Sequence, residues 1–217
     1  VLDAQIKRML ADERAVALSN NFAGQWLEIR NLDTVKPDPQ KFPAWGPELR
    51  DAMKTETRMF FEAMLRENRP LPEFLDAKFT FLNERLAKHY GIPGVSGTKD
   101  DWVRIDDAGR YERGGLLPMA VFLTQSSPGL RTSPVKRGYW VVRRLLGEVI
   151  PPPPPTVPEL PKDEAKTDAP LRDVLAKHRS IPLCAGCHAR FDVFGLALEG
   201  YGPVGEARTK DLAGRAI

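Results

Sequence analysis

The stretch Cys184-Ala185-Gly186-Cys187-His188 decides how the second half of this chain must fold. It contains the only two cysteines of the 217 residues, spaced C-x-x-C and followed at once by a histidine. This spacing is typical of covalent haem attachment. Two thiols on one helical turn reach the two vinyl groups of one porphyrin, and the histidine after them reaches the iron. The motif therefore predicts haem c, with its iron, as the cofactor, held by Cys184 and Cys187 and ligated by His188.

Two other kinds of site contain a C-x-x-C pair. A redox dithiol normally sits at the start of a helix in a βαβ unit, and no buried parallel strand is evident around residue 184. A zinc ion needs four tetrahedral ligands, and only His178 lies near enough in the sequence to complete a set with the motif. The adjacent Cys187 and His188 would be awkward ligands of one metal. Haem attachment fits the pattern better than either alternative.

The composition is that of an ordinary globular protein, with 42% hydrophobic and 28% charged residues. A net charge of +3 is too small to indicate nucleic-acid binding, and no apolar run reaches the length of a membrane span. Because Val1 falls inside an apparent helix, we expect a mature piece or fragment of a longer protein, and the lack of a signal peptide says little. Covalent haem attachment takes place outside the bacterial cytoplasmic membrane, so the motif predicts a periplasmic or exported protein.

Apolar residues at helical spacing predict a mainly α fold with at most a small hairpin. Helices are expected over residues 3–30 (with a candidate break at Asp12), 47–68, 80–90, 116–123, 133–146 and 168–178. The hairpin is expected to pair residues 102–105 with residues 110–113. An unbroken proline run from Pro151 to Pro155, with more prolines after it, predicts a stiff polyproline connector at 150–162.

Several stretches along the chain resemble one family. They are Phe22-Ala23-Gly24-Gln25-Trp26-Leu27, the run FTFLNERLAKHYGIP from Phe79 to Pro93, the run RTSPVKRG from Arg131 to Gly138, the polyproline run, and Cys184 to Arg190 with FGLALE from Phe194 to Glu199. The family is that of the planctomycete-type cytochrome c proteins, large exported proteins of unknown function. The resemblance covers nearly the whole chain. It implies a helical domain over 1–95 and a smaller helical haem c-binding domain over 96–217.

The sixth position on the iron must be filled from upstream if it is filled at all, because no Met or His follows His188. Met119 is the preferred candidate, since it follows a flexible glycine pair and lies in the same predicted domain as the motif. A thioether is an established axial ligand of haem iron, although Met119 could equally pack in a core. His178 and His89 are the next candidates. His178 is only six residues from Cys184, a short tether for reaching the opposite haem face.

Cationic side chains are expected to bind the haem propionates. Arg137 and Arg190 are the predicted partners, with Arg131 and Lys136 as further candidates, and a solvated basic face is the alternative for each of them. The acidic residues after the motif, Asp192 and Glu199, are explained by helix capping and solvation.

A one-haem cytochrome that transfers electrons is the function that these features favour. Its expected partner is a redox protein or a larger membrane-associated complex. One alternative is a structural subunit whose haem stabilises a helical scaffold. Another is a haem enzyme with an open distal site. The enzyme is less favoured, because the sequence contains no evident distal His-Arg pair and no Ser-His-Asp or carboxylate set with persuasive spacing.

Overall fold

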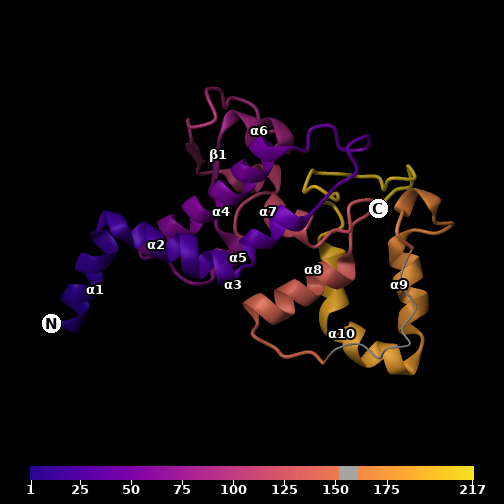
Figure 1. The fold of residues 1–217 in the computed structure, drawn as a ribbon. Coiled ribbons are helices and arrows are strands. Elements are labelled where there is room, and N and C mark those ends of the chain that lie inside the picture. Colours follow the sequence, from indigo (N-terminus) through magenta and orange to yellow (C-terminus); the bar gives the residue numbers. More distant parts are fainter. Residues whose placement is uncertain (152–160) are drawn as a thin grey trace. The chain divides into compact units, whose positions relative to one another are not determined.

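The computed structural model describes residues 1–151 and 161–217, and the predicted mainly α fold is confirmed (Figure 1). Most of the predicted polyproline connector, at 152–160, lies outside the described residues. The chain forms two compact units. The first contains Val1–Thr34 and Ala44–Phe122, and the second contains Val35–Pro43 and Leu123–Ile217. Residues 96–122, which we expected in the haem-binding domain, therefore fold with the first unit.

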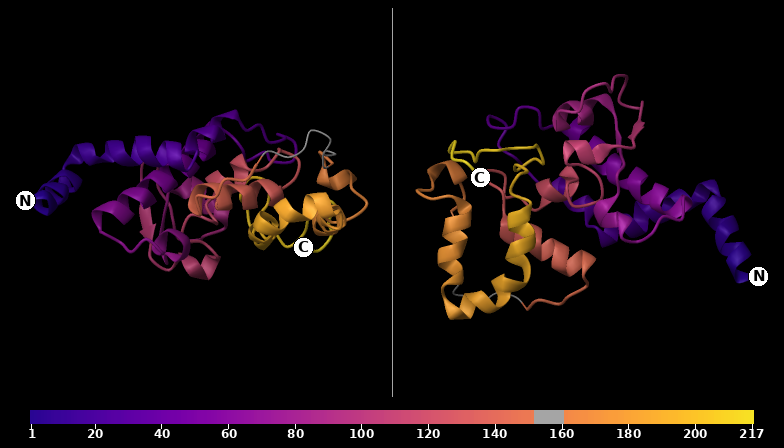
Figure 2. Two further views of the ribbon diagram at one scale, coloured as in Figure 1. Left: turned by 90° about the horizontal axis from the view of Figure 1, so that it is seen from below. Right: turned by 180° about the vertical axis from the view of Figure 1, so that it is seen from behind.

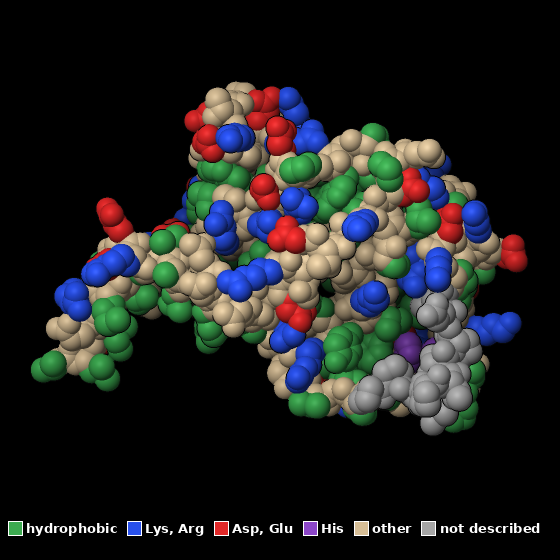
Figure 3. Space-filling view, viewed as in Figure 1, with side chains coloured by type: hydrophobic (Ala, Val, Ile, Leu, Met, Phe, Trp, Pro, Cys, Tyr) green, Lys and Arg blue, Asp and Glu red, His purple; other side chains and the backbone are tan. Residues whose placement is uncertain are grey.

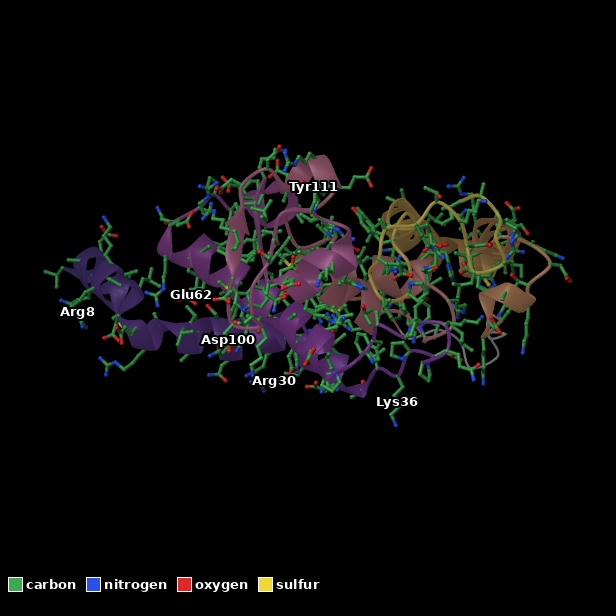
Figure 4. The ribbon with its side chains drawn as sticks, turned by 90° about the horizontal axis from the view of Figure 1, so that it is seen from above. Arg8, Arg30, Lys36, Glu62, Asp100 and Tyr111 are labelled. Carbon is green, nitrogen blue, oxygen red and sulfur yellow. The ribbon has the colours of Figure 1, made fainter. Side chains whose placement is uncertain are left out.

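The first unit is built from short helices around one long one. Its helices are α1 (Leu2–Ala11), α2 (Val16–Leu18), α3 (Gly24–Trp26), α4 (Pro47–Arg66), α5 (Glu73–Asp76) and α6 (Glu84–Tyr90), and α7 (Ala120–Gln125) begins in it. The helix expected over 3–30 breaks at Asp12, whose carboxylate accepts a hydrogen bond from the backbone N–H of Arg14 at 2.9 Å. Helix α1 buries none of its residues, and Figure 4 shows Arg8 projecting from it into solvent.

Helix α4 forms the core of the first unit. Pro47 occupies its first turn, where the missing N–H costs nothing, as expected from the sequence. One face of α4 is fully buried and carries large apolar side chains: Leu49, Met53, Phe60, Phe61 and Met64. These methionine and phenylalanine side chains therefore belong to the hydrophobic core.

The helix expected over 80–90 is shorter than predicted, because its first three residues form a strand. Strand β1 (Thr80–Leu82) pairs antiparallel with β2 (Val103–Ile105), with Thr80 opposite Ile105. Asn83 separates strand from helix, since its backbone is extended and its side chain accepts the N–H of Leu86 at 3.0 Å. The predicted pairing of 102–105 with 110–113 was wrong, because Ala108–Tyr111 is a 3₁₀ turn.

A buried carboxylate joins three elements of the first unit. Glu56 on α4 is 1% exposed and accepts hydrogen bonds from the hydroxyls of Thr80 and Tyr90, each at 2.6 Å. The Tyr90 hydroxyl in turn accepts the backbone N–H of Ala120 at 2.9 Å. Burial raises the pKa of Glu56 to about 7, although the two hydroxyls and Arg113 oppose the rise.

The second unit contains three main helices. They are α8 (Pro134–Trp140), which continues as a π-helical turn over Val141–Leu145, then α9 (Leu171–Arg179) and α10 (Pro182–Ala197). Ser133 caps α8 by accepting the N–H of Lys136 at 3.3 Å, as its Ser-Pro sequence predicted. Helices α9 and α10 run in opposite directions and are joined by a short turn, which the right view of Figure 2 shows. Among the helices of the described ranges, none is both long enough and apolar enough to cross a bilayer.

Two glycines let α8 and α10 cross with their backbones in contact. A Cβ placed on Gly138 would lie 1.9 Å from the carbonyl oxygen of Phe191, and one on Gly195 would lie 1.8 Å from that of Pro134. Neither position tolerates any side chain without moving the helices apart, because backbone atoms cannot yield as a flexible side chain does. The crossing fixes α10 against α8.

We expect Gly138→Ala and Gly195→Ala each to lower the free energy of unfolding by about 3 kcal/mol or more, through overpacking at the helix crossing. Gly186→Ala is the matched control, since it lies on α10 with no atom within 4 Å of a new Cβ. It should be neutral or stabilise by up to about 1 kcal/mol. Denaturant unfolding of the three variants in the same haem state measures this. Equal losses of unfolding free energy in all three variants would contradict the backbone contact between α8 and α10.

The buried Glu56 gives a testable pH dependence. A carboxyl group whose pKa is raised in the folded state stabilises the fold below its unfolded pKa of 4.5, and this contribution is lost as pH rises through about 7. The unfolding free energy of the protein, measured relative to that of Glu56→Gln, should therefore fall between pH 4.5 and pH 7 and level off above. A difference that stays constant over this range would show that the pKa of Glu56 is not raised in the folded state.

Candidate haem site

The C-x-x-C-H motif lies in the first turns of α10. Pro182 starts this helix, and the N–H groups of Cys184 and Ala185 both donate to the carbonyl of Ile181, at 3.0 Å each. Because Cys184 and Cys187 are three residues apart on a helix, their side chains lie on one face. Both are free thiols at partly exposed positions. The pair therefore has the one-turn spacing that the sequence predicted.

A hydrogen bond to a carboxylate orients the His188 ring. Its Nδ1 lies 3.0 Å from each carboxylate oxygen of Asp192, one turn later on α10. The side chain of His188 is 15% exposed, and that of Asp192 is 1% exposed. The contact uses Nδ1, so Nε2 is the nitrogen left for a metal ion.

Asp192 was misread from the sequence. It is neither a cap nor solvated, because it lies in the interior of α10 and is completely buried. Burial raises the pKa of Asp192, while the ring of His188 and the guanidinium of Arg179, 3.7 Å away, lower it. The signal that could have identified it is its spacing of four residues from His188.

Aromatic rings surround the His188 imidazole. The ring of His178, on α9, lies 4.7 Å from it, centre to centre, in an edge-on arrangement. The ring of Phe191 lies 5.0 Å from it and also contacts Tyr139 on α8. Cys187 packs against a small buried cluster of Val142, Ile150 and Phe191. The motif thus lies beside an apolar part of the second unit.

Large apolar side chains are exposed on the elements that carry and contact the motif. They are Tyr139, Leu146, Val149, Ile181, Val193 and Phe194, with Val149 as much as 73% exposed. Figure 3 shows a histidine side chain at the surface of this unit among hydrophobic side chains. Two free thiols on one turn, an imidazole with Nε2 available and exposed apolar side chains all fit haem c.

The described residues include no group of three or more His, Cys, Asp or Glu side chains arranged to hold a metal ion. A haem needs no such group, because the porphyrin supplies four nitrogen ligands to the iron. One axial ligand from α10, His188, is enough.

The candidates for the sixth iron position lie in different units. Met119 belongs to the first unit, not to the unit of the motif, and is 2% exposed. Its sulfur accepts a hydrogen bond from the Thr57 hydroxyl at 3.5 Å. His89, on α6, also belongs to the first unit. Of the three candidates, His178 is the one that the structure places beside His188.

Arg137 does not extend toward the motif. It is 2% exposed, with Nη1 donating to the carbonyls of Leu198 and Tyr201 at 2.7 and 2.8 Å, and Nη2 to that of Gly202 at 2.7 Å. Burial lowers the pKa of Arg137 to about 10, with Glu199 opposing the change. Its donors hold the chain that follows α10, so our prediction of a propionate contact for it has no support in its position.

The other predicted propionate partners differ in exposure. Arg190, on α10, is exposed and forms an ion pair with Glu148. Lys136 is exposed on α8. Arg131 is buried and donates to the carbonyls of Pro161 and Thr132, at 2.7 and 2.8 Å. Arg190 and Lys136 are therefore the two whose charged groups remain accessible.

Glu199 forms part of a buried ionic network that sequence reasoning missed. It accepts hydrogen bonds from the Thr132 hydroxyl at 2.8 Å and from Nη2 of Arg208 at 2.9 Å. Nη1 of Arg208 binds the buried carboxylate of Glu164 at 3.0 Å. Burial raises the pKa of Glu199, against the opposing effect of Arg137 and Arg208. Glu199 is thus a structural residue of this unit, and our expectation that solvation explains it was wrong.

Two family descriptions match the chain. One, PSD4, is described as a protein of unknown function (DUF1592) and matches residues 1–92. The other, PSCyt3, is described as a protein of unknown function (DUF1588) and matches residues 113–211, which include the motif. No curated protein and no solved structure matches the chain. The boundary near residue 95 stays a prediction.

The different positions of Arg137 and Arg190 predict different responses to one substitution. Arg137→Lys should lower the free energy of unfolding by about 3 kcal/mol, because an ammonium group cannot span the buried carbonyls that the guanidinium binds. Arg190→Lys, on the exposed surface, should change it by less than about 0.5 kcal/mol. Chemical denaturation measures both. A loss for Arg190→Lys as large as that for Arg137→Lys would contradict these assignments.

Proposed function

Because the chain belongs to the planctomycete-type cytochrome c proteins, of which it carries two consecutive domains, we propose that it is a c-type cytochrome that transfers electrons through one covalently bound haem. The observation that carries the proposal is the first two turns of α10, where two free thiols on one face precede a histidine with Nε2 available. When bound, haem c supplies a one-electron ferric/ferrous couple.

Each residue of the motif has a defined task. The thiols of Cys184 and Cys187 would hold the haem by adding across its vinyl groups, a redox-neutral addition in which each sulfur bonds to one vinyl carbon and its proton goes to the other. His188 would offer Nε2 to the iron. The exposed apolar side chains on α8 and α10, Phe194 among them, would exclude water from a bound haem. The exposed cations of Lys136 and Arg190 are the proposed propionate partners.

For the sixth iron position, Met119 and His178 both stay proposed ligands. The rings of His178 and His188 lie 4.7 Å apart, centre to centre, which is too close for an iron to lie between them, so His178 would have to move to ligate the opposite haem face. The sulfur of Met119 is already an acceptor for Thr57. Thioether and imidazole ligation differ spectroscopically, since only the thioether gives the weak near-infrared sulfur-to-iron band in the oxidised protein.

The proposed setting is the outer side of a bacterial membrane, where covalent haem attachment takes place. The proposed partner is a redox protein or a larger membrane-associated complex. A second candidate role, a scaffold stabilised by its haem, is favoured by the exposed apolar side chains of the second unit, such as Val149 and Val193, at 73% and 61%. A haem covering them would stabilise the second unit by removing their surface from water.

We expect covalent haem in protein expressed with haem-attachment machinery. It should survive acid extraction and give a c-type pyridine haemochrome. Cys184→Ala and Cys187→Ala should each leave a single thioether, with an altered haemochrome and lower yield, and the double variant should release its haem on extraction. Gly186→Ala, within the motif, is the control and should keep both thioethers, since its Cβ would meet no atom. An apoprotein mass with free thiols, or zinc in place of iron, would refute the proposal.

Redox titration and carbon monoxide binding, measured on the same haem-loaded protein, distinguish an electron-transfer protein from an enzyme with an open distal site. A reversible one-electron redox titration with a low-spin spectrum that carbon monoxide leaves unchanged supports electron transfer. Rapid carbon monoxide binding to the reduced protein would favour an enzyme instead.

A further inference from the structure

A buried carboxylate lies directly behind the predicted iron ligand. Asp192 is 0% exposed, and both its oxygens lie 3.0 Å from Nδ1 of His188. The two residues are four apart on α10, so the helix itself sets the distance between them. The geometry of α10 therefore sets this contact.

Burying a carboxylate requires compensation. An isolated carboxylate moved from water into a protein interior loses several kcal/mol of solvation, so buried charges are paired or hydrogen-bonded. Among the described residues, the hydrogen bonds shown for Asp192 both go to His188, and its nearest guanidinium, that of Arg179, lies 3.7 Å away. The position has no capping role, because it lies five residues before the end of α10. A role directed at His188 accounts for its burial.

We propose that Asp192 is a positioning residue that accepts a hydrogen bond from Nδ1–H of His188. This contact fixes the tautomer in which Nε2 is free to bind the iron. It also stabilises the ferric form of the haem and so lowers its reduction potential. A carboxylate behind a metal-bound imidazole makes that imidazole a stronger donor, since the shared proton leaves more negative charge on the ring. A stronger donor stabilises Fe(III) over Fe(II). The shared proton would stay between Nδ1 and the carboxylate in both oxidation states of the iron. The inference rests on the proposed function.

The haem-loaded protein tests the effect on the iron by redox titration. Asp192→Asn keeps the size and removes the charge, so it should shift the ferric/ferrous equilibrium about tenfold toward ferrous, which is about 59 mV for one electron. Asp192→Glu restores the carboxylate and should reverse much of this shift. The matched control is Asp173→Asn. It removes one exposed negative charge from α9, in the same unit as the motif.

The haem-free full chain tests the tautomer separately. In ¹⁵N spectra of the neutral imidazole, His188 should carry its proton on Nδ1, and Asp192→Leu should move it to Nε2, the form that a free imidazole prefers. The signals of His188 and His178 are distinguished with His178→Gln. A proton on Nε2 in the unsubstituted chain would overturn the positioning role.

The two arms separate the outcomes. A tenfold shift in Asp192→Asn with little change in Asp173→Asn supports the inference. Equal shifts in both, or none, overturn the effect on the iron even if the tautomer is as expected. Failure of the unsubstituted chain to attach haem refutes the proposed function and the effect on the iron together, and the tautomer arm then decides whether Asp192 positions the ring.

Discussion

The crossing of α8 and α10 is the contact on which the second unit depends. Gly138 and Gly195 bring the two backbones together, so the relative position of the helices is set by main-chain atoms instead of by adaptable side chains. Close-packed interiors transmit such constraints with little slack. Phe191, whose carbonyl faces Gly138, lies one residue before Asp192. The crossing thereby fixes the turn of α10 on which His188 and Asp192 meet.

Buried charges then fix the chain on either side of these helices. Arg137 holds the carbonyls of Leu198, Tyr201 and Gly202, and Glu199 joins Thr132 to Arg208. Such networks are weak evidence for stability, because desolvation offsets most of the attraction between the ions. Their geometric demands are strict, since a guanidinium binds several carbonyls only when each is in place. We interpret the network as the device that gives the irregular segment after α10 one conformation.

The first unit uses a buried acid differently. Glu56 has neutral hydroxyl partners, and burial raises its pKa to about 7, so it changes charge near neutral pH. Glu199 faces two guanidinium groups that oppose the effect of burial on its pKa. The same side chain thus serves in one unit as a titratable hydrogen-bonding centre and in the other as an anion between cations.

The sequence alone determined what depends on neighbours along the chain. The spacing of Cys184, Cys187 and His188 predicted the chemistry of the site, because one helical turn holds the whole motif. Apolar periodicity, a proline in the first turn of α4 and the Ser133 cap of α8 are signals that act within a few residues, so the main helices could be predicted from them. What depends on distant parts of the chain was decided only by the tertiary structure. Strand β2 pairs with β1 and not with residues 110–113, which follow it in the sequence. Arg137 is buried and binds the backbone carbonyls of Leu198 and Tyr201, more than sixty residues away. Asp192 became recognisable as the partner of His188 only when packing against α8 and α9 removed it from water, because burial is a property of the assembled core and no local pattern encodes it.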